Sequence, residues 1–353
     1  MKRLNVLDNT LRDGSYAVDF SFTAADTATI CKALERAGVH YIEVGHGGGL
    51  GATAKGLHPA AASDEEYLRA ARSALTSSHF GMFCIPGVAH VDDVDLAADH
   101  GMNFIRIGTD VTKVAESRPF LMRAKQRGLF ATANLMKSYA VPPKQFAEAA
   151  AQSASFGADV VYLVDSAGSM FPEDVLEYLD ALRQRTQVMF GFHGHDNLGM
   201  AVYNSLFSAD HGSSFVDGSL QGLGRSAGNA ATELLAAALD KRGYETGIDV
   251  LRLIKARDEC ACPLLGQPVF SALDVVCGYS GFHTNFLPKV LDAAAEYDMD
   301  PARLIIELCE IDRLSVSDEA LRRVTSRMRE AAMANQTATA TAAPAGVAAR
   351  AGR

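Results

Sequence analysis

The sequence lacks long apolar runs and clusters of basic residues. No apolar run approaches about 18 residues, so no membrane-spanning helix is expected. The formal net charge is −9, and lysine and arginine are scattered along the chain. A protein that binds nucleic acid needs concentrated positive charge, so we expect no nucleic-acid partner.

We also expect no secretory signal, because Lys2 and Arg3 are followed by no apolar signal core. The six cysteines are scattered and lie mostly in apolar stretches, which is typical of reduced, buried thiols in a cytoplasmic protein. Cys260 and Cys262 form a C-x-C pair without a second pair at zinc-finger spacing, so a zinc site there is not favoured. We therefore expect a cytoplasmic protein.

The first two thirds of the chain alternate between short β-rich stretches and stretches of helical length. Strands are predicted at 3–8, 41–45, 80–85, 104–108, 129–135, 160–165, 188–195 and 215–220. Helices are predicted between them, for example at 24–38 and 143–158. Eight such units predict an α/β fold, a (β/α)8 TIM barrel, and strands apolar on both faces fit a buried parallel sheet. A doubly wound open sheet is the alternative.

The alternation ends near Gly243. The following residues predict several helices, for example at 286–299 and 300–312, and the last segment is rich in alanine and threonine without a core pattern. We therefore divide the chain into a TIM-barrel catalytic domain at 1–245, a C-terminal helical domain at 246–333 and a disordered tail at 334–353.

Polar residues gather where the predicted strands end, which is where TIM barrels carry their active sites. His193 and His195 lie two residues apart in a strand, so both side chains point to the same face. Asp13 follows the first strand, which neighbours the last strand in a closed barrel. Asp13, His193 and His195 therefore predict a three-ligand site for a divalent metal ion. The alternative is a pair of hydrogen-bonded histidines in a polar strand end.

Arg12 precedes Asp13 and would place a fixed cation beside the metal. A metal ion and a guanidinium together suit the spread negative charge of an enolate; the alternative is an ordinary surface ion pair of Arg12 with Asp13. The segment 222–230, GLGRSAGNA, lacks the spacing of a P-loop. We interpret its glycines as a tight turn, with Asn229 capping the next helix or lying near the metal.

Several segments resemble metal-dependent pyruvate aldolases and acyl-condensing enzymes that share an Asp-Arg-Glu barrel signature. The resemblance is to the DRE-TIM metallolyase superfamily, which includes isopropylmalate synthase and hydroxymethylglutaryl-CoA lyase, and within it to the 4-hydroxy-2-oxovalerate aldolase family. The similar segments are TLRDGS (10–15), IEVGHGGGL (42–50), VYLVDSAGSM (161–170), GFHGHDNLGMAVYNS (191–205), GLGRSAGNAATE (222–233) and GYSGFHTNFL (278–287). They span nearly the whole chain in the order of that family.

The resemblance implies a lyase that cleaves a 4-hydroxy-2-oxo acid to pyruvate and an aldehyde. It implies that Asp13, His193 and His195 hold the metal, most commonly Mn²⁺, with Mg²⁺ or Co²⁺ as alternatives. It also implies that Arg12 stabilises the pyruvate enolate and that Ser166 contacts the pyruvyl end of the substrate. Family members often pass the aldehyde to an acylating aldehyde dehydrogenase, so we expect such a partner, and we also expect a homodimer.

The chain departs from the family at two positions. The family places a histidine, the general base, directly after RDGS, where this chain has Tyr16, and a tyrosine in the C-terminal segment, where this chain has His283. An exchange of the two residue types favours a retained pair, with His283 as the base and Tyr16 as a hydrogen-bond donor. The alternatives are that Tyr16 is the base, or that both changes are independent and the family chemistry is lost.

Two other functions remain open at this point. One is a Claisen-type acyltransferase that condenses acetyl-CoA with a 2-oxo acid, and the other is a barrel that acts only as a partner subunit of a dehydrogenase. The segment 54–67 differs from the corresponding stretch of the family, and we expect the segment 82–87 to line the aldehyde side of the site. Both leave room for a longer, aromatic or more polar aldehyde than acetaldehyde.

Overall fold

The structure is a computed structural model that describes residues 2–265, 272–280, 282, 286–312 and 315–341. The chain forms two compact units, Met1–Val269 and Phe270–Arg353. The division that we predicted at 245/246 stays a prediction, as does the disordered tail at 334–353. The last described helix, α14, runs from Asp318 to Thr341.

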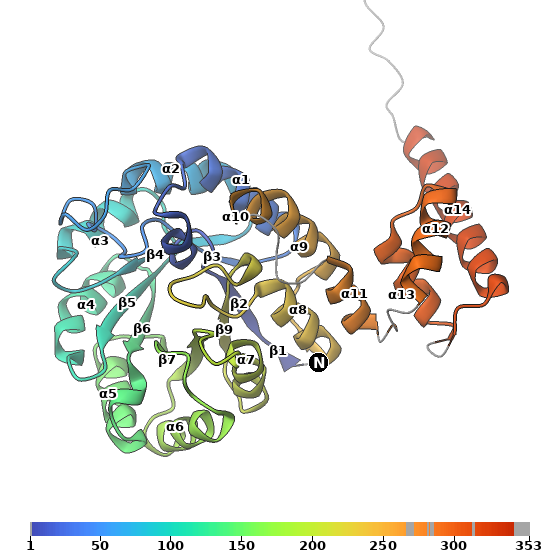
Figure 1. The fold of residues 1–353 in the computed structure, drawn as a ribbon. Coiled ribbons are helices and arrows are strands. Elements are labelled where there is room, and N and C mark those ends of the chain that lie inside the picture. The colour runs from blue at the N-terminus through green and yellow to red at the C-terminus, as the bar shows by residue number, and fades with distance from the viewer. Residues whose placement is uncertain (1, 266–271, 281, 283–285, 313–314, 342–353) are drawn as a thin grey trace, which may run out of the picture. The chain divides into compact units, whose positions relative to one another are not determined.

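The first unit is a closed barrel of eight parallel strands (Figure 1). The strands are β2 (Asn5–Asp8), β3 (Tyr41–Val44), β4 (His79–Cys84), β5 (Phe104–Asp110), β6 (Phe130–Met136), β7 (Val160–Asp165), β8 (Met189–Gly194) and β9 (Phe215–Gly218). Strands β2 and β9 pair in parallel register and close the barrel. The TIM barrel is thereby confirmed, and the open sheet is excluded.

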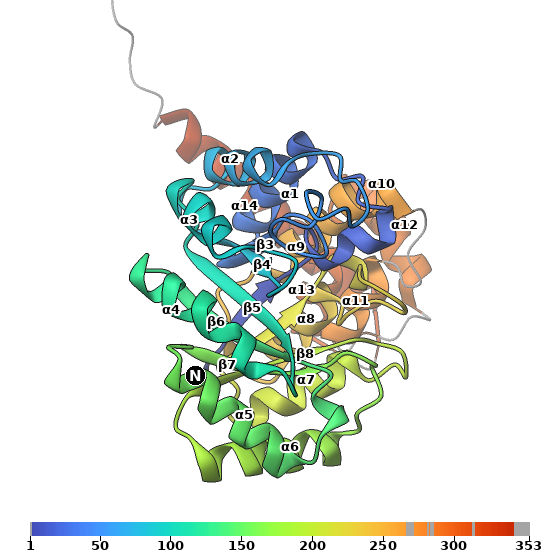
Figure 2. The ribbon, with the colours of Figure 1, turned by 90° about the vertical axis from the view of Figure 1, so that its left-hand side faces the viewer.

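A helix follows each barrel strand, and the helices form a ring around the sheet (Figures 1 and 2). These helices are α1 (Ala24–Arg36), α2 (Asp64–Ala74), α3 (Val91–Asp99), α4 (Arg118–Gln126), α5 (Pro143–Ser155), α6 (Pro172–Arg185), α7 (Ala201–Asp210) and α8 (Thr232–Lys241). Capping boxes begin two of them, at Thr23 with Asp26 and at Ser63 with Glu66. Such reciprocal bonds satisfy backbone N–H groups that a helix start leaves unpaired.

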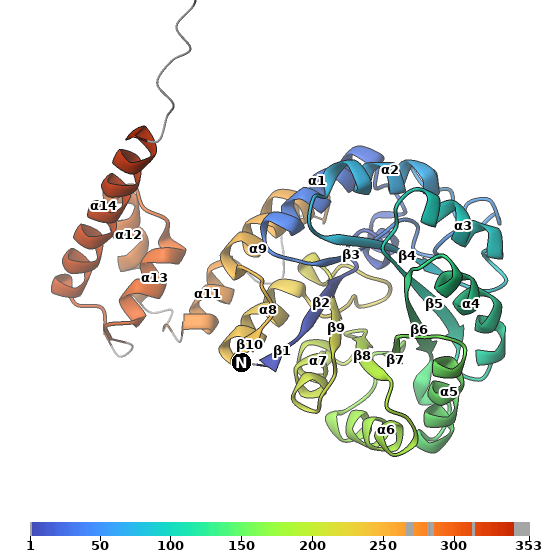
Figure 3. The ribbon, with the colours of Figure 1, turned by 180° about the vertical axis from the view of Figure 1, so that it is seen from behind.

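The first unit continues beyond the eight repeats. Strand β1 (Lys2–Arg3) pairs with β10 (Tyr244–Glu245), so the beginning of the barrel is joined to the segment after α8 (Figure 3). Helix α9 (Val250–Ala256), the π-helical turn η5 (Arg257–Ala261) and α10 (Cys262–Leu265) follow, and α9 lies against α1 and α8.

The second unit is helical, as predicted. Its helices are α11 (Ala272–Ser280), α12 (Leu287–Tyr297), α13 (Pro301–Cys309) and α14 (Asp318–Thr341). Helices α12, α13 and α14 pack together through buried apolar side chains that include Val290, Leu304 and Val324. No described helix is long and apolar enough to cross a membrane.

The inside of the barrel changes from apolar to charged along the strands. Near the strand beginnings, Tyr162 and Phe215 form a buried apolar cluster against which Tyr41 and Phe130 pack. In a strand, the side chains of residues i and i+2 point to the same face of the sheet. Glu43 therefore follows Tyr41 toward the C-terminal end of the barrel, and Asp217 likewise follows Phe215. This arrangement positions buried charges directly beneath the mouth of the barrel.

Candidate active site

The structure brings Asp13, His193 and His195 together in the barrel mouth. Asp13 begins the turn η1 (Asp13–Val18) after β2, His193 lies in β8 and His195 follows it. Asp13 Oδ2 lies 3.9 Å from His193 Nε2 and 4.0 Å from His195 Nε2. One ligand atom from each residue lies within 4.8 Å of the others, and all three residues are buried. This is the set of residues that the H-x-H spacing predicted.

Both imidazoles present Nε2 to this point because their other nitrogen is engaged. His193 Nδ1 lies 2.9 Å from Asp217 Oδ2, and His195 Nδ1 lies 3.3 Å from the carbonyl oxygen of Gly228. A carboxylate and a carbonyl only accept hydrogen bonds, so each Nδ1 carries the hydrogen. With the hydrogen on Nδ1, the lone pair of a neutral imidazole lies on Nε2, an orientation typical of metal-binding histidines.

The donor set fits a divalent metal ion. Asp13 Oδ2 and Asn229 Oδ1 are buried and have no hydrogen-bond partner among the described residues. Buried polar atoms are normally paired, so an unpaired carboxylate oxygen that faces two imidazole nitrogens needs another partner. One carboxylate oxygen and two imidazole nitrogens suit first-row divalent ions.

The protonation states of the site also fit metal binding. Burial opposes ionisation of Asp13, but the charge of Arg12 and the two imidazoles outweigh it and hold the pKa of Asp13 well below its usual value. Burial and the nearby His193 lower the pKa of His195 to about 4. At neutral pH, the site therefore offers a carboxylate and a neutral imidazole, the forms that bind metal ions.

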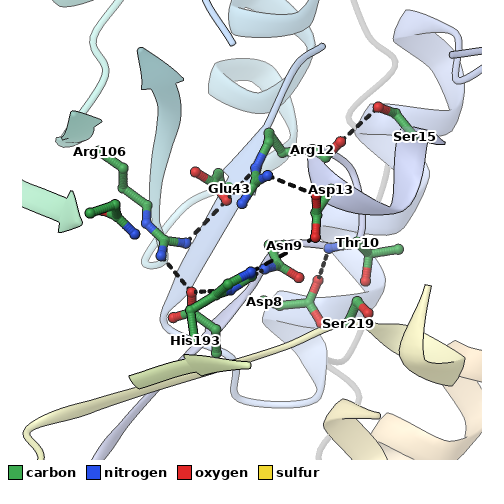
Figure 4. Close-up of polar contacts among 12 residues, drawn as sticks. Asp8, Asn9, Thr10, Arg12, Asp13, Ser15, Glu43, Arg106, His193 and Ser219 are labelled. Atoms are coloured by element: carbon green, nitrogen blue, oxygen red, sulfur yellow. Dashed lines mark hydrogen bonds and ion pairs between the residues drawn. The ribbon is translucent and has the colours of Figure 1, made fainter. Parts of the chain in front are cut away.

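Arg12 is buried and held from two sides (Figure 4). Its Nη1 donates to Asp13 Oδ1 over 2.9 Å, and its Nε donates to Glu43 Oε2 over 2.8 Å. The guanidinium also lies over the ring of Phe83, 4.6 Å from its centroid. The alternative of a surface ion pair is therefore wrong, because the guanidinium is fixed in the barrel mouth.

A buried chain of charges continues beneath the mouth. Arg106 Nη1 donates to Glu43 Oε2 over 3.1 Å (Figure 4). Arg106 Nη2 donates to Asp217 Oδ2, the same oxygen that accepts from His193. Arg12 and His193 are thus linked through Glu43, Arg106 and Asp217. Asp217 was not among the predicted site residues, although an acid inside the apolar strand FVDG was a signal for it.

A pocket opens above this network. Its lining combines the two imidazoles with other polar, charged and apolar residues. The lining residues are Arg12, Asp13, Tyr16, Gly47, Phe83, Ile85, Asn134, Met136, Val164, Ser166, His193, His195 and Arg225. Two of these, Phe83 and Ile85, come from the segment 82–87 that we expected on the aldehyde side. The pocket is thus lined by both charged or polar and apolar side chains.

Tyr16 and Ser166 both line this pocket, whereas His283 lies outside the described residues, and the roles of all three stay predictions. The hydroxyl oxygen of Ser166 accepts a hydrogen bond from the backbone N–H of Lys137 over 2.9 Å. Burial raises the pKa of Tyr16, although the nearby Arg12 opposes this effect. Tyr16 therefore holds its hydroxyl proton more firmly than a tyrosine in water.

Asn229 does not cap α8, because that helix begins at Thr232 and its N-cap residue is Ala231. The Nδ2 of Asn229 instead donates to the carbonyl oxygen of Leu223 over 2.9 Å, and Asn229 bridges to His195 through the backbone. The capping interpretation is thus wrong. The prediction that Asn229 lies near the metal site fits its unpaired Oδ1 and its contact with the residue after β8.

Comparisons with known proteins agree with this geometry. The sequence model of the HMGL-like family matches residues 3–259. The 4-hydroxy-2-oxovalerate aldolase of Carboxydothermus hydrogenoformans is 38% identical over 308 residues, which cover 87% of this chain and 92% of that protein. The 4-hydroxy-2-oxovalerate aldolase 2 of Rhodococcus opacus is 39% identical over 308 residues, 87% of this chain and 89% of that protein.

Solved structures support the fold. The HMG-CoA lyase of Bacillus subtilis superimposes with a TM-score of 0.66 at 22% identity, covering 77% of this chain and 97% of that chain. A likeness at this identity bears on the barrel and not on the reaction. The family match and the relatives that align over most of their length show that this chain belongs to the HMGL-like family and is an aldolase of that family.

Proposed function

We propose that this protein cleaves, or in the reverse direction forms, a 4-hydroxy-2-oxo acid, with pyruvate and an aldehyde as the other side of the reaction. The observation that carries the proposal is the unpaired Asp13 Oδ2 facing the Nε2 atoms of His193 and His195, directly beside the fixed guanidinium of Arg12. The curated relatives named 4-hydroxy-2-oxovalerate aldolase support the substrate class.

Asp13, His193 and His195 would hold a divalent ion, with Asn229 Oδ1 as a further oxygen donor. This donor set suits several divalent ions; we favour Mn²⁺, with Mg²⁺ or Co²⁺ as alternatives, because the resemblance to the aldolase family implies it. When bound, such an ion polarises the oxygens of a 2-oxo acid as a Lewis acid.

Arg12 stabilises the charge that develops on pyruvate as the C3–C4 bond breaks. Its Nε and Nη1 are engaged by Glu43 and Asp13, and among the described residues no hydrogen bond occupies its Nη2. The fixed guanidinium lines the pocket and is therefore ready to donate to the enolate oxygen without reorganising. Holding this donor in place before the reaction is the contribution of Glu43 and Asp13.

Ser166 and Tyr16 position the substrate. Because Ser166 Oγ already accepts from Lys137, its own hydroxyl hydrogen is free to donate to the pyruvyl carboxylate. The raised pKa of Tyr16 favours a role as a hydrogen-bond donor to the C4 hydroxyl or the carbonyl group. The base that removes the C4 hydroxyl proton is then His283, whose usual pKa of about 6.5 suits proton transfer near neutral pH.

Release of pyruvate tests the proposal. The full chain is loaded with Mn²⁺ and given 4-hydroxy-2-oxopentanoate, and pyruvate is followed by coupling to lactate dehydrogenase; the metal-free protein is the control. The acyltransferase alternative instead predicts thiol release from acetyl-CoA and a 2-oxo acid. Turnover with neither substrate set would favour the partner-subunit alternative. The acylating aldehyde dehydrogenase and the homodimer stay predictions.

A further inference from the structure

The pocket contains a second arginine whose situation differs from that of Arg12. Arg225 lines the same pocket but is exposed, and its guanidinium carbon lies 5.9 Å from the centroid of the Tyr16 ring. Arg12 is neutralised by Glu43 and Asp13. Arg225 has no carboxylate within ion-pair distance among the residues that the structure describes. Its charge is therefore available to a ligand.

The loop that carries Arg225 is built tightly. A Cβ at Gly224 would lie 2.5 Å from Asn229 Nδ2, and a Cβ at Gly228, whose φ is +91°, would lie 2.1 Å from the carbonyl oxygen of Gly222. Asn197 Nδ2 also donates to Ser226 Oγ over 2.7 Å, which ties the loop to the segment after β8. These close contacts fix the backbone, so Arg225 is presented at the pocket by a rigid turn.

The charge of the lining points to the kind of ligand. Arg12 and Arg225 are its cationic residues, and Asp13 is its single acid among the described lining residues. A bound divalent ion would add more positive charge. A substrate with one carboxylate, at its pyruvyl end, leaves the Arg225 side of the pocket without an anion. The planar fork of a guanidinium can pair with both oxygens of a planar carboxylate.

Building on the proposed function, we propose that Arg225 binds an anionic group on the aldehyde half of the substrate. The substrate class is then a 4-hydroxy-2-oxo acid with a second anionic group beyond C4, and the aldehyde product carries a carboxylate. The covalent step is unchanged. The C4 hydroxyl gives its proton to the base as its C–O bond becomes the aldehyde carbonyl, the C3–C4 bond breaks with its electron pair entering the enolate, and the enolate takes up a proton at C3 to give pyruvate. Arg225 contacts the part of the substrate that does not react.

The test uses aldol addition of pyruvate to aldehydes by the Mn²⁺-loaded full chain. Succinic semialdehyde carries a carboxylate, glycolaldehyde phosphate carries a phosphate, and pentanal is an uncharged chain of similar length. We expect the unmodified protein to prefer succinic semialdehyde in kcat/KM over pentanal and over the phosphate. In Arg225→Met, the preference for succinic semialdehyde over pentanal should fall about 10- to 100-fold, the usual weight of a charge-assisted hydrogen bond.

Two further variants control for charge and shape. Arg225→Lys should keep part of the preference, because it retains the charge and loses the planar fork. Arg69→Met removes the same charge from the exposed pair with Glu65 on α2 and should leave the preference unchanged. If Arg69→Met loses the preference for succinic semialdehyde as fully as Arg225→Met does, the effect comes from the overall charge of the protein. That result would overturn the role of Arg225.

A binding measurement separates this proposal from the proposed function. The compounds 2-oxoheptanedioate and 2-oxoheptanoate share a carbon chain and differ only in the terminal carboxylate. Tighter binding of the first by calorimetry, lost in Arg225→Met, supports the anion site even if no aldehyde is turned over. Equal binding of both overturns it. An equal loss toward charged and uncharged aldehydes in Arg225→Met also overturns it, because Arg225 would then act on the pyruvyl carboxylate.

Discussion

His193 donates its Nδ1 hydrogen to Asp217 Oδ2 across 2.9 Å, inside the barrel and away from water. This bond sets which imidazole nitrogen faces Asp13. The carboxylate of Asp217 is shared with Arg106, whose other Nη atom contacts Glu43 beneath Arg12. The orientation of a predicted metal ligand and the orientation of a predicted enolate-binding residue therefore depend on one buried network.

Asp217→Asn tests this dependence. The amide removes the charge that fixes the His193 tautomer and that neutralises Arg106. We expect the affinity for Mn²⁺ to fall about 10- to 100-fold, as is usual when a carboxylate behind a ligating histidine is lost. Titration with Mn²⁺ followed by electron paramagnetic resonance measures this effect. Asp210→Asn, which removes a carboxylate from the surface pair with Arg242, should bind the metal as the unmodified protein does.

The ligand assignment itself is tested by removing His195. His195→Ala leaves two of the three donors, and we expect the purified protein to lose most of its bound metal and nearly all activity, because two protein ligands cannot complete the shell. Elemental analysis after dialysis measures the metal content. Full metal content together with full activity in this variant would show that His195 is not a ligand.

Arg12→Lys separates charge from geometry. The ammonium keeps the positive charge but cannot contact Glu43, Asp13 and an enolate at the same time. We expect kcat to fall about 10²- to 10³-fold, the usual loss when one preorganised donor to a developing oxyanion is removed. Metal content should change little. A near-normal kcat would remove Arg12 from enolate stabilisation.

The roles proposed for Tyr16 and His283 predict which of their variants loses more kcat. If His283 is the base, His283→Ala should lose far more kcat than Tyr16→Phe, and the acid limb of the pH–rate profile should disappear with the histidine. Tyr16→Phe should still show that limb. The opposite ranking, with a crippled Tyr16→Phe and a mild His283→Ala, would make Tyr16 the base despite its raised pKa.

Glu233, a buried acid that is not one of the proposed metal ligands, should make the stability of the fold depend on pH. Burial raises its pKa from 4.5 to about 7, although the backbone N–H of Gln221 stabilises the carboxylate. The folded state therefore holds a proton that the unfolded chain releases. The resulting stabilisation is complete below pH 4.5 and is lost as the pH rises through about 7.

Glu233→Gln should remove this dependence. The variant should match the unmodified protein near pH 4.5 and exceed it at pH 8, by at most about 3 kcal/mol in the free energy of unfolding. Thermal unfolding at several pH values measures the difference. Glu177→Gln, an exposed change on α6, is the matched control. A Glu233→Gln variant with the same pH dependence as the unmodified protein would contradict the raised pKa.

The barrel was predictable because its signal is local and repeated. Eight apolar strands at regular intervals, each followed by an amphipathic stretch, predict the same fold even when single strand ends shift by a residue or two. The three proposed ligands were predictable for a related reason: H-x-H fixes two side chains on one face, and closure of the barrel brings β2 within two strands of β8. The family resemblance rests on the same short motifs.

By itself, the sequence determined the alternation of strands and helices, the paired histidines and the acid after the first strand, because each depends on residues close together in the chain. Only the tertiary structure decided which nitrogen of His193 faces Asp13, that Arg12 is buried, and that Arg225 shares a pocket with it. Those facts arise from contacts across the barrel, between residues such as Arg106 and Asp217 that lie 111 positions apart. Hydrogen bonds and burial at that separation follow from packing, which no short motif records.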